Sequence, residues 1–368
     1  MTKREIEIYN LIKNNPFISQ KEIAEKVGIK RSSVGVHIAN LIKKGKVKGK
    51  CYILNQNDYV IVIGGSNIDL TGFSDERIIL NDSNPGSLKI SLGGVGRNIA
   101  ENLARVNINT KLLSVVGRDI YGEKIIDESR IIGIDMDSVY VSHNNPTSTY
   151  LSVMDNDGDM KLAISDMVIS SEISIEYLEN HKELILRAKA LVIDTNMDEH
   201  VIDYIFNVFS DKKIFVDTVS TVKAIKIKKH LNKIYTLKPN KIEAEKLLNI
   251  EINDDSDMKN AVEKFLKLGV KQVIISNGSK NIHYGNYKGV FNKKTKKIDI
   301  VNSTGAGDAF MAGLVYSYMK DIELDKAINI SMEMSKFALE SEKTISDLIS
   351  EKRILESVKE QKKCMKNI

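Results

Sequence analysis

Short runs of β-branched and aliphatic residues alternate with helical stretches over most of the chain, and this alternation restricts the fold. The runs lie at residues 59–63, 112–117, 191–194, 214–217, 235–238 and 273–276. Gly64 and Gly65 close the first run, and Gly117 closes the second. Strands that are apolar along their whole length are buried on both faces, and strands joined through helices run parallel. The sequence therefore predicts an α/β body with a doubly wound parallel sheet.

Two further segments, at about 70–92 and 140–166, predict a small β-sheet separate from the main one. Residues 70–92 show strand and turn signals without a helix, and Asn84-Pro85-Gly86 is the clearest turn. Residues 147–154 and 160–164 flank an Asp157-Gly158 turn, which is typical of a hairpin. The chain contains neither the G-x-G-x-x-G of dinucleotide folds after its first strand nor a G-x-x-x-x-G-K-[ST] motif, which disfavours the first class and excludes P-loop enzymes.

Composition indicates a globular protein of the reducing cytoplasm. Apolar residues make up 42% of the chain and charged residues 28%, which is ordinary for a folded domain. No apolar run approaches the roughly 20 residues of a membrane span, and the first residues lack the apolar core of a signal peptide. Cys51 and Cys364 lie far apart and the histidines form no cluster. A metal held by Cys or His is therefore not expected.

The charge is unevenly distributed along the chain. Residues 1–50 carry 12 Lys and Arg against 4 Asp and Glu, whereas the remainder carries 42 against 45. A basic head on a mildly acidic body indicates that only the head meets nucleic acid. We therefore divide the chain into a head, residues 1–55, and a body, residues 56–368.

The head has the pattern of three short helices followed by a wing. Ser19 and Glu22 have capping-box spacing before the second helix, and Gly28 ends it. A third helix is expected from about 31 to 44, with Val34, Ile38, Leu41 and Ile42 on one apolar stripe. Residues 46–54 alternate enough for a short two-stranded wing. This arrangement resembles a winged helix-turn-helix.

The third helix of the head carries the side chains that would enter a major groove. They are Arg31, Ser32, Ser33, His37 and Asn40. Lysines 43, 44, 46, 48 and 50 would lie near phosphates. The alternative is a small helical module used for dimer contacts, with merely solvated lysines. The basic wing favours binding to double-stranded DNA.

Residues 301–310 form a tight turn of small residues that opens into a helix. Gly305 and Gly307 leave no side chain in the way of a ligand, and the free N–H groups of the turn can hold an anion. Asp308, at the start of the helix, has two possible roles. It could cap the helix, or it could act as a general base toward a hydroxyl while the adjacent N–H groups hold a phosphoryl group.

A second glycine turn, residues 93–98, also enters a helix. Gly93, Gly94 and Gly96 favour the close approach of a ligand, and Asn98 points back toward the turn. The alternative is a plain connection between a strand and a helix. Asn67 and Asp69 follow the carboxyl end of the first strand, which is where ligands bind in open α/β sheets.

Two later strand ends carry polar groups. Asn240 and Glu243 lie one turn apart at the start of a helix, either as a helix cap or as part of a site. Ser276 and Gly278 end another strand, at a plausible place for a nucleotide phosphate or ribose.

Taken together and in this order, the motifs resemble those of the ribokinase (PfkB) family of sugar and nucleoside kinases. The residues that carry the resemblance are Gly64, Gly65, Asn67, Asp69, Gly93, Gly94, Gly96, Asn98, Asn240, Glu243, Thr304, Gly305, Gly307 and Asp308. The resemblance covers residues 58–350. Within the family, residues 83–86, 93–105, 147–151 and 301–302 look most like those of the pseudouridine kinases.

The resemblance implies a ribokinase-like α/β body with a small β-sheet lid. It further implies transfer of the ATP γ-phosphoryl group to the ribose 5′-hydroxyl of pseudouridine. Asp308 would be the base, and Gly305, Ala306 and Gly307 would supply the anion hole. The groups implied to hold the substrate are Asn67, Asp69, Gly93, Gly94, Asn98, Thr149 and Asn196.

The resemblance also implies where ATP and its cations bind. Asn240 and Glu243 would sit by Mg²⁺ and the triphosphate, with Ser276, Gly278 and Thr304 by the nucleotide. Asn302 stands where the family often has Asp beside a K⁺ site, so its amide oxygen can coordinate K⁺ but brings no charge. The lid implies a homodimer.

Two other functions remain open from the sequence. One is a kinase of another ribose compound, such as ribose, adenosine or inosine. The other is a transcription regulator whose body only senses a nucleoside. The kinase hypothesis requires that Asp308 not be buried and that it lie within a side chain's reach of the groove that holds Asp69 and Asn98.

Overall fold

The computed structural model describes residues 1–15, 18–47, 58–278, 280–295 and 298–364. The contacts within the chain divide it into two compact units, Met1–Asn57 and Asp58–Ile368. Each unit has its own hydrophobic core and is described by itself below.

The first unit, the head, is a three-helix module whose helices begin and end at specific capping residues. Its helices are α1 (Lys3–Asn14), α2 (Gln20–Val27) and α3 (Arg31–Lys43). The side chain of Ser19 accepts a hydrogen bond from the Glu22 N–H, and the Glu22 carboxylate accepts one from the Ser19 N–H, which confirms the predicted capping box. Gly28 ends α2 in the left-handed region, with φ of 68°.

Two expectations for the head are wrong in detail. Ile42 is 38% exposed, because Val34, Ile38 and Leu41 alone fill the stripe of α3 that faces the core. Lys44 is not free for a phosphate, since its Nζ lies 2.7 Å from the buried Glu5 carboxylate. The predicted wing falls largely on residues 48–57, including Lys48 and Lys50, which lie outside the described residues.

The second unit, the body, is built on a mixed sheet in which eight of the described strands take part. Their order is β14-β13-β12-β11-β10-β9-β1-β4, and β4, β1, β9, β10, β11 and β12 run parallel. The bounds are β1 (Val60–Ile63), β4 (Thr110–Leu113), β9 (Ala190–Asp194), β10 (Ile214–Asp217), β11 (Thr236–Lys238), β12 (Gln272–Ile275), β13 (Ile282–Asn286) and β14 (Gly289–Lys293). Five of the six predicted core strands are present within two residues of their expected bounds.

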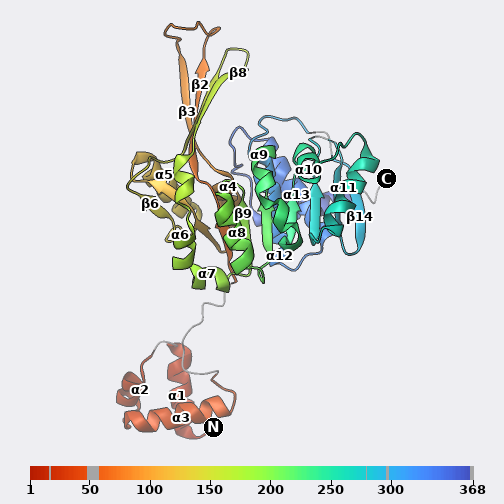
Figure 1. The fold of residues 1–368 in the computed structure, drawn as a ribbon. Coiled ribbons are helices and arrows are strands. Elements are labelled where there is room, and N and C mark those ends of the chain that lie inside the picture. Colours follow the sequence, from red (N-terminus) through yellow and green to blue (C-terminus); the bar gives the residue numbers. More distant parts are fainter. Residues whose placement is uncertain (16–17, 48–57, 279, 296–297, 365–368) are drawn as a thin grey trace. The chain divides into compact units, whose positions relative to one another are not determined.

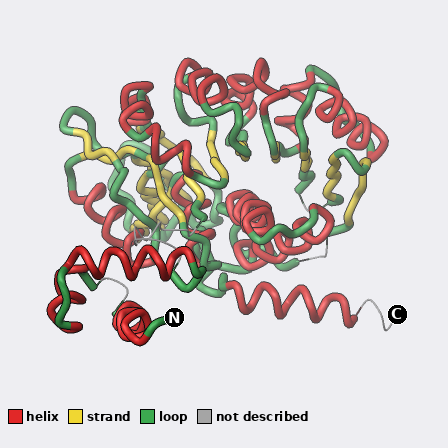
Figure 2. The backbone as a smooth tube through the Cα atoms, turned by 90° about the horizontal axis from the view of Figure 1, so that it is seen from below, coloured by secondary structure: helices red, strands yellow, loops and turns green. Residues whose placement is uncertain are grey.

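Helices cover both faces of this sheet, as the alternation predicts (Figures 1 and 2). In β1, Val60 and Val62 point into one core cluster, and Ile61 and Ile63 point into the other. The helical elements of the body are α4 (Val95–Arg105), α5 (Ile120–Ile132), η1 (Val168–Glu172), α6 (Ile175–Asn180), α7 (Lys182–Arg187), α8 (Glu199–Val208), α9 (Thr221–Ala224), η2 (Ile225–Lys233), α10 (Lys241–Leu248), α11 (Asp255–Lys267), α12 (Ala306–Met319), α13 (Leu324–Leu339) and α14 (Glu351–Cys364).

A four-stranded sheet, called the lid sheet here, extends away from the main sheet (Figure 1). It contains β2 (Asn67–Ser74), β3 (Gly86–Gly93), β7 (Thr149–Met154) and β8 (Met160–Asp166) in the order β3-β2-β7-β8. Asp69 pairs with Ser91 and Tyr150, so these three side chains share one face.

The sixth predicted core strand and part of the expected lid differ from the prediction. Residues 112–117 are two strands, because the chain leaves the main sheet after β4 and continues as β5 (Val115–Gly117). β5 pairs with β6 (Tyr140–Ser142) in a separate two-stranded sheet. Residues 140–142 therefore do not belong to the lid sheet. Among the described residues, no helix is long and apolar enough to span a membrane.

Candidate active site

Asp308 is the third residue of α12 and does not cap that helix. The cap position belongs to Gly305, at φ of 81°, which has no side chain. Asp308 Oδ2 instead accepts a hydrogen bond of 2.8 Å from Asn98 Nδ2, which comes from the first turn of α4. The two glycine turns predicted from the sequence therefore meet at this bond, 210 residues apart in the chain.

The carboxylate of Asp308 lies in a buried and charged environment. It is only 8% exposed, so the expectation that it would not be buried is wrong; the required reach to Asn98 is met. Burial raises the pKa of Asp308 to about 7, and the charge of Asp217 acts in the same direction against the opposing effects of Asn98 and Lys238. Partial desolvation is what gives a carboxyl the basicity of a general base near neutral pH.

The turn before α12 is packed against the segment that follows α13. A Cβ added at Gly305 would stand 2.1 Å from the carbonyl oxygen of Thr344, so only glycine fits there. At Gly307, the nearest atom to an added Cβ would be Lys238 Nζ at 3.4 Å. An ammonium group therefore lies beside Gly307, and it and the free N–H groups at the N-terminus of α12 can each hold an anion.

Lys238 ends β11 and belongs to a buried group of charges. Its Nζ lies 3.2 Å from Asp217 Oδ2, at the end of β10. Burial by itself lowers the pKa of Lys238, but the neighbouring charges of Asp217 and Glu243 outweigh it and raise that pKa. The lysine is therefore held in its cationic form at the carboxyl ends of the strands.

The start of β2 and the end of β3 form a polar corner at Gly93, the first residue of the glycine turn that leads to Asn98. Asn67 Nδ2 donates to Asp69 Oδ1 at 2.6 Å. A Cβ added at Gly93 would stand 2.5 Å from Asp69 Oδ2 and 2.8 Å from Asn67 Nδ2. Burial raises the pKa of Asp69, although Asn67 and Arg97 oppose this. A carboxylate and an amide placed in this way suit the hydroxyl groups of a sugar.

Asp194, at the end of β9, connects the glycine turn at residues 64–65 with the one at residues 93–96. Its Oδ2 accepts hydrogen bonds from the N–H groups of Gly65, at 2.8 Å, and Gly96, at 3.0 Å. An added Cβ at Gly94, where φ is 96°, would stand 2.4 Å from the Gly65 carbonyl oxygen. The glycines therefore let two backbone segments touch, and one buried carboxylate holds them together.

Asn196 lies two residues beyond Asp194 and borders the same turn. Its N–H donates to Asp194 Oδ1 at 2.9 Å, and its Oδ1 accepts from Lys223 Nζ at 2.6 Å. A Cβ on Gly65 would stand 3.3 Å from Asn196 Nδ2. The structure thus places Asn196 beside the glycine turn at Gly65, and its role toward a substrate stays a prediction.

Thr149 does not join the other candidate substrate residues. It pairs with Ile68 in β2, so it lies on the face of the lid sheet opposite to Asp69. Its hydroxyl donates to the carbonyl oxygen of Thr147 at 3.1 Å. Tyr150 and Ser152 take the face that Asp69 occupies, because a shift of one residue along a strand changes the face.

Asn240 and Glu243 form a complete capping box at the start of α10. Asn240 Oδ1 accepts from the Glu243 N–H at 2.9 Å, and Glu243 Oε2 accepts from the Asn240 N–H at 2.8 Å. The hydroxyl of Thr218 also donates to Glu243 Oε2 at 2.5 Å. The capping role is therefore present, and it holds both side chains at the ends of β10 and β11.

Ser276 lies next to Asn240, and Gly278 follows in open space. A parallel bridge joins Asn240 and Ser276, and the Lys241 N–H donates to the Ser276 carbonyl oxygen at 2.8 Å. A Cβ on Gly278 would have nothing within 4 Å. The four candidate nucleotide residues thus lie at the ends of β11 and β12.

Asn302 and Thr304 belong to the loop before α12. Asn302 Oδ1 accepts a hydrogen bond of 2.9 Å from the Thr304 N–H, so this oxygen already shapes the loop. Among the described residues, no group of three or more His, Cys, Asp and Glu side chains is arranged to hold a metal ion.

A cavity of about 910 Å³ opens between the lid sheet, α4 and the loops at 301–304 and 342–347. Asp69 lies at its wall, and the same face of the lid sheet adds Thr71, Phe73, Tyr150 and Ser152. The wall therefore offers a carboxylate, hydroxyl groups and aromatic rings. A cavity of this size and lining can hold a small polar molecule that carries a flat ring.

Sequence reasoning missed three charged residues of the site. Asp194, Asp217 and Lys238 are each the last residue of a predicted strand. Ligands of open α/β sheets bind at the carboxyl ends of strands, and that rule could have found all three. Their burial is what makes them unusual, and burial is not visible in the sequence.

The family follows from comparison with known proteins. The model of the pfkB family of carbohydrate kinases matches residues 57–351. The chain belongs to the PfkB family. A winged helix-turn-helix DNA-binding model matches residues 1–48. PfkB proteins are phosphotransferases with an alcohol acceptor, so this chain is a sugar or nucleoside kinase, and the family implies ATP and a divalent metal ion.

Two relatives of this PfkB protein come from Escherichia coli. Its pseudouridine kinase is 37% identical over 85% of this chain and 100% of its own length. An uncharacterized sugar kinase, YeiI, is 38% identical over 87% of this chain and 89% of its own length.

Solved structures agree on the fold of the PfkB body. A protein from Clostridium perfringens, solved by crystallography, has a TM-score of 0.77 at 35% identity, with 83% of this chain and 97% of that chain covered. Ribokinase from Arabidopsis thaliana, solved with ribose and ATP, has a TM-score of 0.72 over 83% of this chain and 99% of that one. At 18% identity, the second likeness bears on the fold alone.

Proposed function

We propose that this PfkB protein phosphorylates the ribose 5′-hydroxyl of pseudouridine with ATP. The observation that carries the proposal is the hydrogen bond between Asp308 and Asn98. It joins a basic carboxylate to the glycine turn of residues 93–98, in which Gly93 borders Asn67 and Asp69. The choice of substrate is supported by the Escherichia coli pseudouridine kinase, whose full length is matched by 85% of this chain.

In the proposed reaction, Asp308 takes the proton of the 5′-hydroxyl as the oxygen bonds to the γ-phosphorus. The bond from that phosphorus to the β–γ bridging oxygen breaks, and ADP leaves. Asn67, Asp69, Gly93, Gly94 and Asn98, with Asn196 beside them, would hold the ribose hydroxyls. Positioning of this kind supplies most of the catalysis in phosphoryl transfer.

Negative charge on the transferred group would be held by the turn before α12. The N–H groups of Gly305, Ala306 and Gly307 lie at the N-terminus of α12, and Lys238 Nζ lies beside Gly307. Because these groups are already in place, little reorganisation accompanies the reaction.

The nucleotide would lie at the ends of β11 and β12. Asn240, Glu243, Ser276, Gly278 and Thr304 are the proposed contacts. The amide and carboxylate oxygens of Asn240 and Glu243 are hard ligands that suit Mg²⁺ or its water shell, and the ion would neutralise phosphate charge. Asn302 is the candidate for K⁺, although its Oδ1 is already engaged by the Thr304 N–H. We place the reaction in the cytoplasm, where ATP is made and used.

The lid sheet would close over the acceptor and exclude water from the γ-phosphoryl group. Its face opposite Asp69 exposes Leu88, Ile90, Leu162 and Ile164, of which Leu88 is 83% exposed. An apolar face of this kind marks a protein interface, and we propose that a second copy of the chain covers it. A monomer in sedimentation at assay concentrations would exclude the homodimer.

A panel of acceptors tests the substrate. Pseudouridine, uridine, ribose, adenosine and inosine are each supplied with ATP and Mg²⁺, and ADP formation is measured. The proposal expects the highest kcat/KM with pseudouridine. If ribose, adenosine or inosine is preferred, the chain is a kinase of that compound. If no acceptor yields ADP but a nucleoside changes DNA binding, the body is a sensor in a transcription regulator.

Turnover is expected to depend on pH through Asp308. The pKa of this carboxyl is raised to about 7, so the ionised base is lost as pH falls through that value and kcat falls with it. The charge of Lys238 opposes this rise. Lys238→Met should therefore move the acidic limb of the pH–kcat profile to higher pH and lower kcat at pH 7. An unmoved limb would show that Lys238 does not act on Asp308.

We also propose that the head binds double-stranded DNA through α3. Arg31, Ser32 and Asn40 are exposed on α3, and Ser33 and His37 are partly exposed. Lys43→Ala, at an exposed lysine that is expected near a phosphate, should weaken binding to duplex DNA and lower the salt slope by about one unit, as the loss of one phosphate contact requires. Lys246→Ala, on the surface of the body, is the control. Equal salt slopes for both variants would remove Lys43 from the interface.

A further inference from the structure

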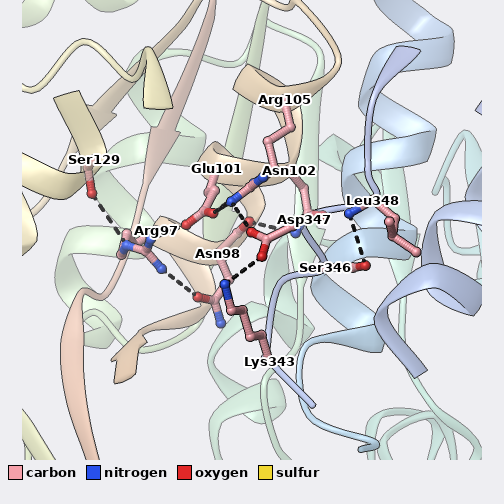
Figure 3. A network of polar contacts seen from close by, with 10 residues as sticks. All are labelled: Arg97, Asn98, Glu101, Asn102, Arg105, Ser129, Lys343, Ser346, Asp347 and Leu348. Atoms are coloured by element: carbon pink, nitrogen blue, oxygen red, sulfur yellow. Dashed lines mark hydrogen bonds and ion pairs between the residues drawn. The ribbon is translucent and has the colours of Figure 1, made fainter. Parts of the chain in front are cut away.

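A continuous set of charged side chains runs from Asn98 along α4 to the loop that follows α13 (Figure 3). Arg97 Nη1 donates to Asn98 Oδ1 at 3.2 Å, and Arg97 also pairs with Glu101. Glu101 Oε1 accepts from Arg105 Nε at 2.8 Å. Arg105 Nη2 lies 3.3 Å from Asp347 Oδ1, and Lys343 pairs with the same carboxylate.

The inner end of this set determines how the amide of Asn98 is oriented. A guanidinium only donates hydrogen bonds, so the side of Asn98 that faces Arg97 must be its oxygen. The amide nitrogen is then directed to Asp308. Arg97 is 2% exposed and its Nε also reaches Ser129 Oγ at 3.4 Å, so its position is fixed from several sides.

The outer end of the set meets the loop at residues 341–347, which touches two other parts of the site. Thr344 packs against Gly305, where an added Cβ would stand 2.1 Å from its carbonyl oxygen. Lys89, in strand β3 of the lid sheet, donates to the Glu342 carbonyl oxygen at 3.2 Å. The loop therefore contacts the turn before α12, the lid sheet and α4 at once.

We propose that Arg97, Glu101, Arg105 and Asp347 are positioning residues that keep the acceptor side of the site in register with the turn that holds the phosphoryl group. At the inner end of the set, Arg97 fixes Asn98. At the outer end, Arg105 fixes Asp347 in the loop that packs against Gly305. α4 and the loop at 341–347 are far apart in the sequence. Local structure alone therefore does not fix the position of Asn98 relative to this loop. Glu101 is the centre, since its buried carboxylate is shared by both arginines.

This inference rests on the proposed function for its kinetic test, so the test has two readouts. In the full chain, kcat and the KM values for pseudouridine and for ATP are measured for Arg105→Met, Asp347→Asn and the double variant. Hydrogen exchange of residues 301–308 is measured on the same proteins without substrate. The control is Asp137→Asn, since Asp137 Oδ1 also lies 3.3 Å from an arginine Nη2, that of Arg130, at the surface.

Each single variant should lower kcat by about tenfold with KM for ATP unchanged, and the double variant should be no worse than either. Exchange of residues 301–308 should quicken in all three proteins and stay unchanged in Asp137→Asn. Additive losses of kcat, or exchange equal to that of the control, would overturn the proposal. If the wild type yields no ADP but exchange responds as expected, the proposed function fails and the positioning role stands.

Arg97 tests the inner end. Arg97→Lys keeps the buried charge beside Glu101 but cannot hold Glu101 and Asn98 with one planar fork. We expect a fall in kcat of about 10²-fold, the scale of a misplaced reacting group, at an unchanged melting temperature. Arg97→Met removes the charge as well and should lower both kcat and the melting temperature. Wild-type kcat in a folded Arg97→Lys protein would overturn the role of Arg97.

Discussion

Replacing Asp308 by asparagine is expected to lower kcat by about 10²–10⁴-fold, the usual contribution of a positioned general base. An amide has nearly the same shape as the carboxylate but cannot take the proton of the acceptor hydroxyl. Its oxygen can still accept the hydrogen bond from Asn98 Nδ2. The KM for ATP should change little, because the nucleotide is proposed to lie at the ends of β11 and β12.

The measurement is steady-state turnover with pseudouridine and ATP, together with thermal unfolding. Glu333→Gln is the matched control, since Glu333 is a buried carboxylate, 3% exposed, that pairs with Ser357 far from the glycine turns in the chain. Both variants should unfold near the wild-type temperature, and only Asp308→Asn should lose turnover. Turnover of Asp308→Asn within a few-fold of wild type would remove Asp308 from its role as base.

Replacing Gly305 by alanine is expected to lower kcat by about 10²–10³-fold, as the loss of one anion-hole donor does. The added Cβ would stand 2.1 Å from the Thr344 carbonyl oxygen, and the backbone at Gly305 has φ of 81°. Either the turn or the loop at 341–347 must move, and the N–H groups of Ala306 and Gly307 then leave their positions. The effect on kcat should be much larger than the effect on KM for pseudouridine.

Gly133→Ala separates this effect from backbone strain. Gly133, at the end of α5, has φ of 102°, yet an added Cβ there has nothing within 4 Å. It should cost about 1 kcal/mol of stability through the left-handed backbone and leave kcat unchanged. If both alanine variants have the same kcat, the contact between Gly305 and Thr344 is not needed for turnover.

The elements of both units could be predicted from the sequence where one local signal dominates. The core strands are recognisable because they are apolar on both faces. The glycine turns are recognisable because Gly94, at φ of 96°, and Gly305, at φ of 81°, adopt backbone angles that favour glycine. The capping box of Ser19 and Glu22 is equally local. These features depend on a few neighbouring residues, and the sequence contains all of them.

The features that escaped prediction depend on pairing between distant segments. The face on which Thr149 lies is set by its register with β2, and nothing near Thr149 specifies that register. Ser114 interrupts an apolar run that looks continuous, because the strand moves to a new partner there. Arg97 and Glu101 look like an ordinary surface pair until α5 and the loop at 341–347 cover them.

The residues proposed to contact the acceptor base and those proposed to act on the phosphoryl group lie on different parts of the fold. Thr71, Tyr150 and Ser152 lie on one face of β2 and β7 in the lid sheet. Asp308 belongs to α12, Gly305 caps that helix, and Lys238 ends β11 in the main sheet. Under the proposed function, variation at the first set would alter which acceptor is admitted without disturbing the groups that we propose transfer the phosphoryl group. A library restricted to the inner face of this small sheet is therefore the economical route to a kinase with a new nucleoside preference.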